Sequence, residues 1–112
     1  MKYGRRRDAN ERAIIEALER VGCAVTQLEG TGVPDLAVEY HGVLRFLEVK
    51  EVKPGKTLVH RRNHDDPDHP ELTPAQVAWW KRWVELGGRP PAIVHDIAEA
   101  LAAIGAQVSI DS

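Results

Sequence analysis

Two acids and a lysine in a predicted hairpin have the clearest chemical potential in this sequence. Asp35 follows a proline, and Glu48 and Lys50 flank a single residue in the next apolar run. The pair His41-Gly42 lies between the two runs, which is typical of a two-residue hairpin turn, and counting from it places Asp35 directly opposite Glu48. Because side chains alternate along a strand with a period of two, Lys50 shares the face of Glu48.

Such a pair of acids is unfavourable by itself, because like charges directly opposed on neighbouring strands destabilise a sheet. Two carboxylates and a lysine on one sheet face form a site for a hard divalent cation and a polarised water. The structural alternative makes Asp35 a turn residue and Glu48 a strand-edge charge paired with Lys50. Two opposed acids on an apolar-lined face favour the cation over that alternative.

Helices and strands alternate around this hairpin in a pattern that predicts an α/β fold. Helical signals are a D-x-x-E capping box at Asp8 with apolar residues at helical spacing up to Gly22, and Thr73-Pro74 as N-cap and first residue of a second helix. Both faces of the hairpin are largely apolar, which predicts a sheet covered on both sides. The expected elements are helix 8–22, strands 23–28, 33–40 and 43–50, helix 73–88, strand 92–95, a helix capped by Asp96 through Ile104, and a last strand at 107–110.

Composition sets the class of protein. The chain has 112 residues, of which 43% are hydrophobic and 29% charged, and we expect a single soluble domain over residues 1–112 with a long, proline-broken loop at 51–72. There is no apolar run of the ~20 residues that a membrane span needs, so we expect a cytoplasmic protein. The single cysteine, Cys23, excludes an internal disulfide and is interpreted as a small buried hydrophobe. The net charge of −2 gives no global support for nucleic-acid binding.

Five segments together resemble the PD-(D/E)xK nuclease superfamily, and within it the archaeal Holliday junction resolvases and the VRR-nuc domains of phages and repair nucleases. The resemblance covers roughly residues 9 to 96 and implies a restriction-endonuclease-like αβββαβ core, with a mixed sheet flanked by helices. The segments are Glu11-Arg12, Gly22-Cys23-Ala24-Val25, Gly32-Val33-Pro34-Asp35-Leu36, Leu47-Glu48-Val49-Lys50 and Leu72-Thr73-Pro74-Ala75-Gln76.

The resemblance implies the chemistry of the site. Asp35 and Glu48 would ligate Mg²⁺ or Mn²⁺ together with the main-chain carbonyl of Val49, with one or two metals. Lys50 would orient or help to deprotonate the attacking water, or stabilise the pentavalent phosphate. A hard cation suits this role because hydroxide attack on an anionic phosphodiester needs both charge neutralisation and a more acidic water.

Two helical residues admit a structural and a functional interpretation. Glu11 is the capping-box partner of Asp8, yet it also lies on the stripe of Ile14 and Leu18 that faces the sheet, and we favour a metal-site or water-binding role. Gln76 is the capping-box partner of Thr73, and the resemblance makes it an equal candidate for the catalytic site.

Basic residues are the candidates for contact with DNA phosphates, although charges near termini and on helix faces are usually only solvated. Five of the candidates lie in the N-terminal basic run and in the long loop, and one on the second predicted helix: Arg5, Arg6, Arg7, Arg61, Arg62 and Lys81, the last followed by Arg82.

The tryptophans and the loop histidines are also ambiguous. Trp79, Trp80 and Trp83 could stack on bases, but their helical spacing favours a core or a dimer interface. His60, His64 and His69, among the aspartates at 65, 66 and 68, have the composition of a metal cluster without the spacing of a known ligand motif, which favours a loop that approaches DNA.

We therefore expect a Mg²⁺-dependent endodeoxyribonuclease that cuts branched DNA such as Holliday junctions. A nuclease of this size is expected to act as a homodimer, in a bacterial or phage-infected host cell, in DNA repair or recombination. The alternatives are a restriction-like nuclease, a single-strand or flap nuclease with the same chemistry, and a non-catalytic DNA-binding module.

Overall fold

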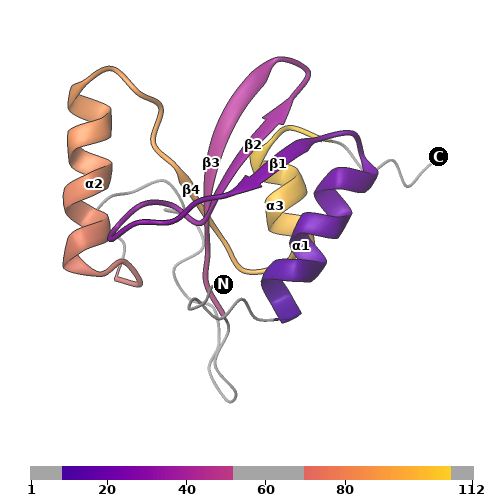
Figure 1. Ribbon diagram of the computed structural model, residues 1–112, viewed down its shortest axis with the longest axis horizontal. Coiled ribbons are helices and arrows are strands. Elements are labelled where there is room, and N and C mark those ends of the chain that lie inside the picture. Colours follow the sequence, from indigo (N-terminus) through magenta and orange to yellow (C-terminus); the bar gives the residue numbers. More distant parts are fainter. Residues whose placement is uncertain (1–8, 52–69, 107–112) are drawn as a thin grey trace.

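The computed structural model describes residues 9–51 and 70–106, which form a four-stranded mixed sheet with helices on both faces (Figure 1). Helix α1 spans Ala9–Arg20, and strands β1, β2 and β3 span Ala24–Gln27, Leu36–Tyr40 and Val43–Val49. Helix α2 spans Pro74–Glu85, strand β4 Ala92–Val94 and helix α3 Ile97–Ala103. The element order confirms the α/β prediction up to α3. The predicted strand at 107–110, Asp8 of the first capping box and most of the predicted loop, 52–69, lie outside the described residues.

The hairpin has the predicted register. Its strands β2 and β3 are antiparallel, and Tyr40 pairs with Val43 across the turn. His41 and Gly42 both have positive φ, 53° and 82°, as a two-residue turn of this twist requires. The order in the sheet is β1-β2-β3-β4, with β1 antiparallel to β2 and β4 parallel to β3. The carboxyl ends of β3 and β4 therefore meet at the same edge.

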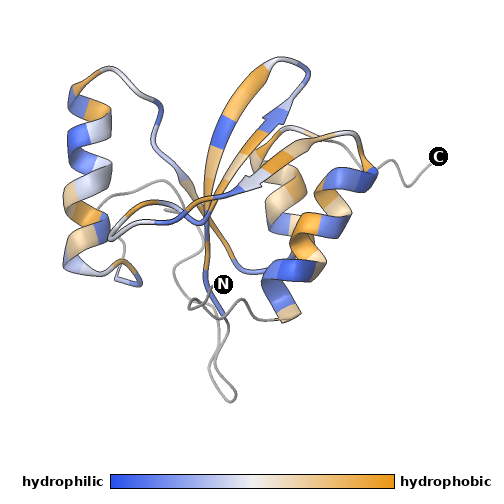
Figure 2. Ribbon diagram, in the orientation of Figure 1, coloured by the Kyte–Doolittle hydropathy of each residue, from blue (hydrophilic) through white to orange (hydrophobic). Residues whose placement is uncertain are grey.

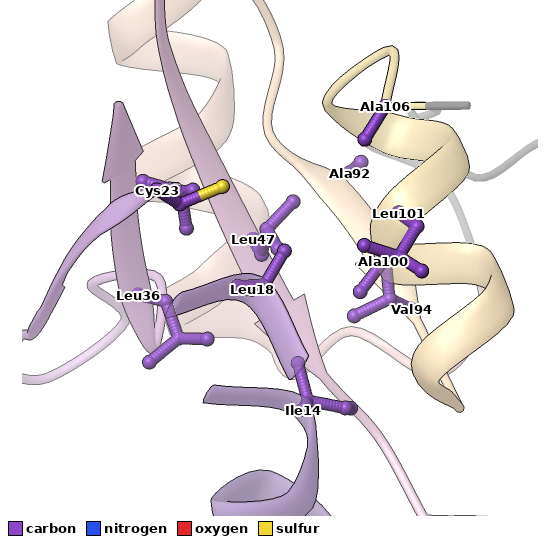
Figure 3. Packing of buried hydrophobic residues seen from close by; sticks show 11 residues of the cluster. Ile14, Leu18, Cys23, Leu36, Leu47, Ala92, Val94, Ala100, Leu101 and Ala106 are labelled. Carbon is purple, nitrogen blue, oxygen red and sulfur yellow. The ribbon is translucent and has the colours of Figure 1, made fainter. Parts of the chain in front are cut away.

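The main core lies between the sheet and the pair α1 and α3, which stand side by side in Figure 1. Figure 3 shows Ile14 and Leu18 of α1 directed toward Leu36 and Leu47 of the sheet, and all four are fully buried. Cys23 belongs to this cluster, which confirms that it is a small buried hydrophobe, and burial raises the pKa of its thiol. In Figure 2 the strands are mostly apolar, while α1 and α2 alternate between polar and apolar residues, as amphipathic helices do.

Helix α2 covers the opposite face. Phe46, which alternates with the core residue Leu47, packs edge-on against Trp79 and Trp83, with ring centroids 5.7 and 5.3 Å away. Trp80 is fully buried, so the core interpretation holds for it, whereas Trp79 and Trp83 are half-buried and stacked on each other. Both faces of the sheet are thus covered, as predicted.

The helices do not cover the turn end of the β2–β3 hairpin. Val43 and Leu44, on opposite faces next to the turn, are 56% and 51% exposed. An arginine that the sequence did not single out is buried instead: Arg45 donates from Nε to the carbonyl of Ala103 and from Nη1 to that of Pro90. It thereby satisfies a carbonyl at the end of α3, one of the groups that a helix leaves unbonded. None of the helices in residues 9–51 and 70–106 is long and apolar enough to cross a membrane.

Candidate active site

The two predicted acids lie at the end of the hairpin that is farther from its turn. The last pair of the register is Leu36 with Leu47, and Asp35 and Glu48 are the residues that adjoin this pair on the two chains. Both side chains are buried, with residue exposures of 7% and 2%. Asp35 is held in place because its Oδ2 accepts a hydrogen bond of 2.8 Å from the backbone N–H of Val49. The acid is therefore attached to β3, the strand that carries Glu48.

Gln76, in the first turn of α2, joins Glu48 to Lys50. Its Nε2 donates to Glu48 Oε2 at 2.7 Å, and its Oε1 accepts from Lys50 Nζ at 3.1 Å. The lysine also lies close to the glutamate itself, with Nζ 3.7 Å from Glu48 Oε2. A buried carboxylate is stable only when it is paired or hydrogen-bonded, and Glu48 has both kinds of partner here.

Gln76 also closes the predicted capping box. Its Oε1 accepts from the backbone N–H of Thr73, and the Thr73 hydroxyl accepts from the backbone N–H of Gln76. One side chain therefore completes the cap and also contacts two charged residues of the candidate site. The cap fixes the conformation of the amide that reaches the two charged groups, so the start of α2 is part of the site.

The turn that contains Gly32 lies against the first turn of α2. Gly32 has φ of +79°, and a Cβ at this position would overlap the backbone carbonyl of Ala75. Only glycine combines that conformation with that contact. The turn that leads into Pro34-Asp35 thus packs directly on the first turn of α2, which brings Gln76 to the strand ends.

Glu11 is buried in α1, 6% exposed, and its Oε2 accepts a hydrogen bond of 3.3 Å from Gln27 Nε2. Gln27 pairs with Leu36, a residue of the α1 side of the sheet, whereas Glu48 lies on the α2 side. In the described part of the chain, no group of three or more histidine, cysteine, aspartate or glutamate side chains is arranged to hold a metal ion. The structure therefore brings Glu48, Lys50 and Gln76 together beside Asp35, and it places Glu11 with Gln27.

The predicted DNA contacts are only partly described. Arg5, Arg6, Arg7, Arg61 and Arg62 lie outside the described residues, as do the loop histidines. Lys81 and Arg82 are exposed on α2, and Arg82 lies 4.0 Å from Glu85 in an exposed pair of the kind that contributes little to stability.

A buried histidine close to this edge of the sheet was missed by the sequence interpretation. His95 follows β4 directly and is 4% exposed. Its Nδ1 lies 2.9 Å from Glu99 Oε1 and its Nε2 2.7 Å from Glu71 Oε1. The spacing of His95 and Glu99, four residues apart at a helix start, was a usable signal. The contact with Glu71 crosses 24 positions and depends on tertiary structure.

These two glutamates determine the charge of His95. Burial disfavours the imidazolium and pushes its pKa down, but the hydrogen bonds and charges of Glu99 and Glu71 together outweigh burial and raise the pKa above its ordinary value of 6.5. The protonated form of His95 is thus more stable than that of a free imidazole.

Comparisons of the chain with protein-family models, with curated proteins and with solved structures gave no match.

Proposed function

We propose that this chain is a metal-dependent DNA endonuclease with the restriction-endonuclease-like fold of the PD-(D/E)xK superfamily, most like the VRR-nuc and Holliday junction resolvase groups. The observation that carries the proposal is the convergence of Glu48, Lys50 and Gln76 beside Asp35 at the end of β3. An acidic pair, a lysine and a hydrogen-bonding amide from three separate segments meet at one place, and each charged group is held by a named partner.

The donor set fits a hard divalent cation. Asp35, directly before β2, and Glu48, on β3, offer carboxylate oxygens, and the main-chain carbonyl of Val49 belongs to the residue whose N–H holds Asp35. Oxygen donors of this type are those that Mg²⁺ and Mn²⁺ prefer. When bound, such a cation would neutralise phosphate charge and make a water more acidic.

The side chains have distinct roles in the proposed hydrolysis. Asp35, fixed by Val49, and Glu48, fixed by Gln76, would present carboxylate oxygens in constant positions. The Lys50 ammonium has three N–H donors, and a bond to Gln76 Oε1 leaves it able to orient a water or a phosphate oxygen. Such positioning before the reaction is a main source of catalytic rate in phosphoryl chemistry.

Branched DNA is the proposed substrate, and a homodimer the proposed form. The family resemblance supports the substrate, and the small size of the chain supports two copies that together grip a junction. The exposed Lys81 and Arg82 lie on the same helix as Gln76, where they can contact the phosphate backbone next to the site.

The proposal is tested by incubating the protein with four-way junction, flap, duplex and single-stranded DNA in Mg²⁺, Mn²⁺ or chelator. We expect metal-dependent cleavage of the junction and its loss in Glu48→Gln and Lys50→Ala. Glu39→Gln is the matched control, because Glu39 is an exposed acid on the same sheet face, opposite Leu44 and far along the strand from the site. Equal cleavage by all three variants would disprove the mechanism.

The same panel separates the alternatives. Base-specific cutting of linear duplex would indicate a restriction-like enzyme, and preference for flaps or single strands a nuclease of another substrate class. Binding to DNA without any metal-dependent cutting would indicate a non-catalytic module. Gel filtration that gives a stable monomer, with intact four-way junctions, would remove the resolvase proposal.

A further inference from the structure

Glu71, His95 and Glu99 form a cluster of ionisable side chains around a buried imidazole ring. Burial alone disfavours charged groups in such a place. The His95 side chain is 2% exposed, that of Glu99 13% and that of Glu71 33%. A neutral imidazole has a single N–H and can donate to only one carboxylate. Because both ring nitrogens lie within hydrogen-bonding distance of a carboxylate oxygen, both bonds form only with the imidazolium.

One end of the cluster is attached to the rigid core. Glu99 Oε1 also accepts the backbone N–H of His95 at 2.8 Å, and the backbone N–H of Glu99 is bonded to Asp96, the N-cap of α3. The carbonyl of His95 accepts from Asn10 Nδ2 of α1 at 3.0 Å. The histidine is therefore fixed to α3 and α1, the two helices that cover the main core.

The other end reaches the start of α2. Glu71 stands two residues before Thr73, the N-cap of α2, and its carboxylate is held by His95 Nε2. This helix contacts the sheet through large aromatic side chains such as Phe46 and Trp83, and through the close approach at Gly32. A charged hydrogen bond just ahead of the N-cap restrains the position of the first turn, where Gln76 lies.

We propose that the Glu71–His95–Glu99 cluster is a positioning device, which holds the first turn of α2 so that Gln76 stays bonded between Glu48 and Lys50. These two glutamates and the histidine are positioning residues and touch no substrate. The effect on cleavage rests on the proposed nuclease function, whereas the effect on Gln76 does not.

The device responds to pH because its central bond needs a charged ring. The charged groups bonded to His95 or next to it in the chain are Glu71 from the segment before α2, and Glu99 and Asp96 at the start of α3. From the other elements packed here, Glu11 follows Asn10, which donates to the His95 carbonyl, and Lys50, just after β3, donates its backbone N–H to the carbonyl of Val94. Deprotonation of the ring removes one of the two bonds to carboxylate. The restraint on α2 therefore weakens as the pH rises through the raised pKa of His95.

The test follows the Gln76 side-chain amide by NMR in the full chain. In the wild type we expect its Nε2–H resonances to shift with the same pH midpoint as the His95 ring. Glu71→Ala is expected to abolish this coupling and to raise the exchange rate of the Gln76 amide roughly three- to tenfold, the effect of losing one partly exposed charged hydrogen bond. Glu71→Gln keeps an acceptor for His95 without the charge, so it should restore part of the protection and lower the His95 midpoint.

Glu85→Gln is the matched control, because Glu85 is an exposed acid at the far end of the same helix. Unchanged resonances of core residues such as Leu47 would show that the fold is intact. If the Gln76 amide keeps its wild-type shift and exchange rate in Glu71→Ala, the positioning proposal is wrong. A DNA-cutting assay separates the positioning proposal from the proposed nuclease function. If Gln76 follows the titration of His95 but the protein cuts no DNA, only the nuclease function is wrong. If both proposals hold, Glu71→Ala lowers kcat while the KM for DNA stays unchanged.

Discussion

Replacing Gln76 by glutamate tests whether the site is built to collect positive charge. The substitution keeps the size of the side chain and the capping box, because glutamate accepts the Thr73 N–H as glutamine does. It replaces the amide nitrogen that lies 2.7 Å from Glu48 Oε2 with a carboxylate oxygen. The variant therefore adds one negative charge beside two buried acids and leaves the rest of the helix start unchanged.

The expected loss of stability follows from three contributions. Two unit charges about 4 Å apart repel by about 4 kcal/mol near a protein surface. Loss of the hydrogen bond to the charged Glu48 costs a further ~1.5–3 kcal/mol. Lys50, whose Nζ is 3.1 Å from Gln76 Oε1, attracts the introduced carboxylate with an energy similar to the repulsion. The net destabilisation without metal is therefore about 1.5–3 kcal/mol at neutral pH, the cost of the lost hydrogen bond. Low pH relieves it because the two facing carboxylates can share a proton.

Urea unfolding followed by tryptophan fluorescence measures this change, since three tryptophans lie on α2. We expect the variant to be less stable than the wild type in chelator and to recover in Mg²⁺ or Mn²⁺. A cation at 100 times its dissociation constant contributes about 2.7 kcal/mol, enough to offset the loss. Gln76→Ala is the control, because it removes the same hydrogen bond without adding a charge.

The decisive result is the difference between chelator and metal. If divalent cations stabilise neither the wild type nor Gln76→Glu relative to chelator, no cation is bound between these oxygens. The proposed chemistry would then lose its physical basis, even if the fold is correct.

Three further predictions concern the core, the turn and the histidine. Leu47→Ala should lower the free energy of unfolding by about 2–5 kcal/mol because Leu47 is fully buried, whereas Leu44→Ala, at a 51% exposed position, should change it by less than about 0.5 kcal/mol in the same urea titration. Gly32→Ala should destabilise the chain by at least ~1 kcal/mol more than Gly42→Ala, since both positions have positive φ but only the Cβ at position 32 would meet the α2 backbone; equal losses in urea would contradict this. The stability of the wild type should fall as the pH rises through the raised folded pKa of His95, because the stabilisation from the protonated ring is complete below its unfolded value near 6.5. His95→Gln should flatten that slope in urea titrations between about pH 6 and 9, and an unaltered slope would assign it to another group.

Local signals predicted the hairpin and the helix caps correctly. A turn of two residues with positive φ fixes the register of the strands it joins, so counting from His41-Gly42 predicted the pairs from Tyr40–Val43 to Leu36–Leu47, which adjoin Asp35 and Glu48. The Thr73 capping box and the Asp96 cap were also visible, because a helix N-terminus is decided by side chains within three or four residues.

Contacts between distant segments were not predicted. The sequence left Gln76 equally a cap or a site residue. The structure shows that its amide completes the cap and also bonds to Glu48 and Lys50, because Gly32 lets α2 approach the strand ends. Glu11 was favoured for a metal-site or water-binding role, which stays a prediction; its hydrogen bond to Gln27, a result of how α1 lies across the sheet, was not predicted. The exposure of Leu44 likewise depends on how far α2 extends along the hairpin.

The sequence by itself determined the alternation of elements, the register of the hairpin and therefore the neighbourhood of Asp35, Glu48 and Lys50. These features depend on backbone geometry and on residues close in the chain, which a period of two or a turn encodes directly. Tertiary structure alone decided that Gln76 bridges Glu48 to Lys50 and that His95 is held between Glu71 and Glu99. Those contacts arise from the packing of helices on a sheet, and a pattern along the chain does not specify how far or at what angle a helix is placed.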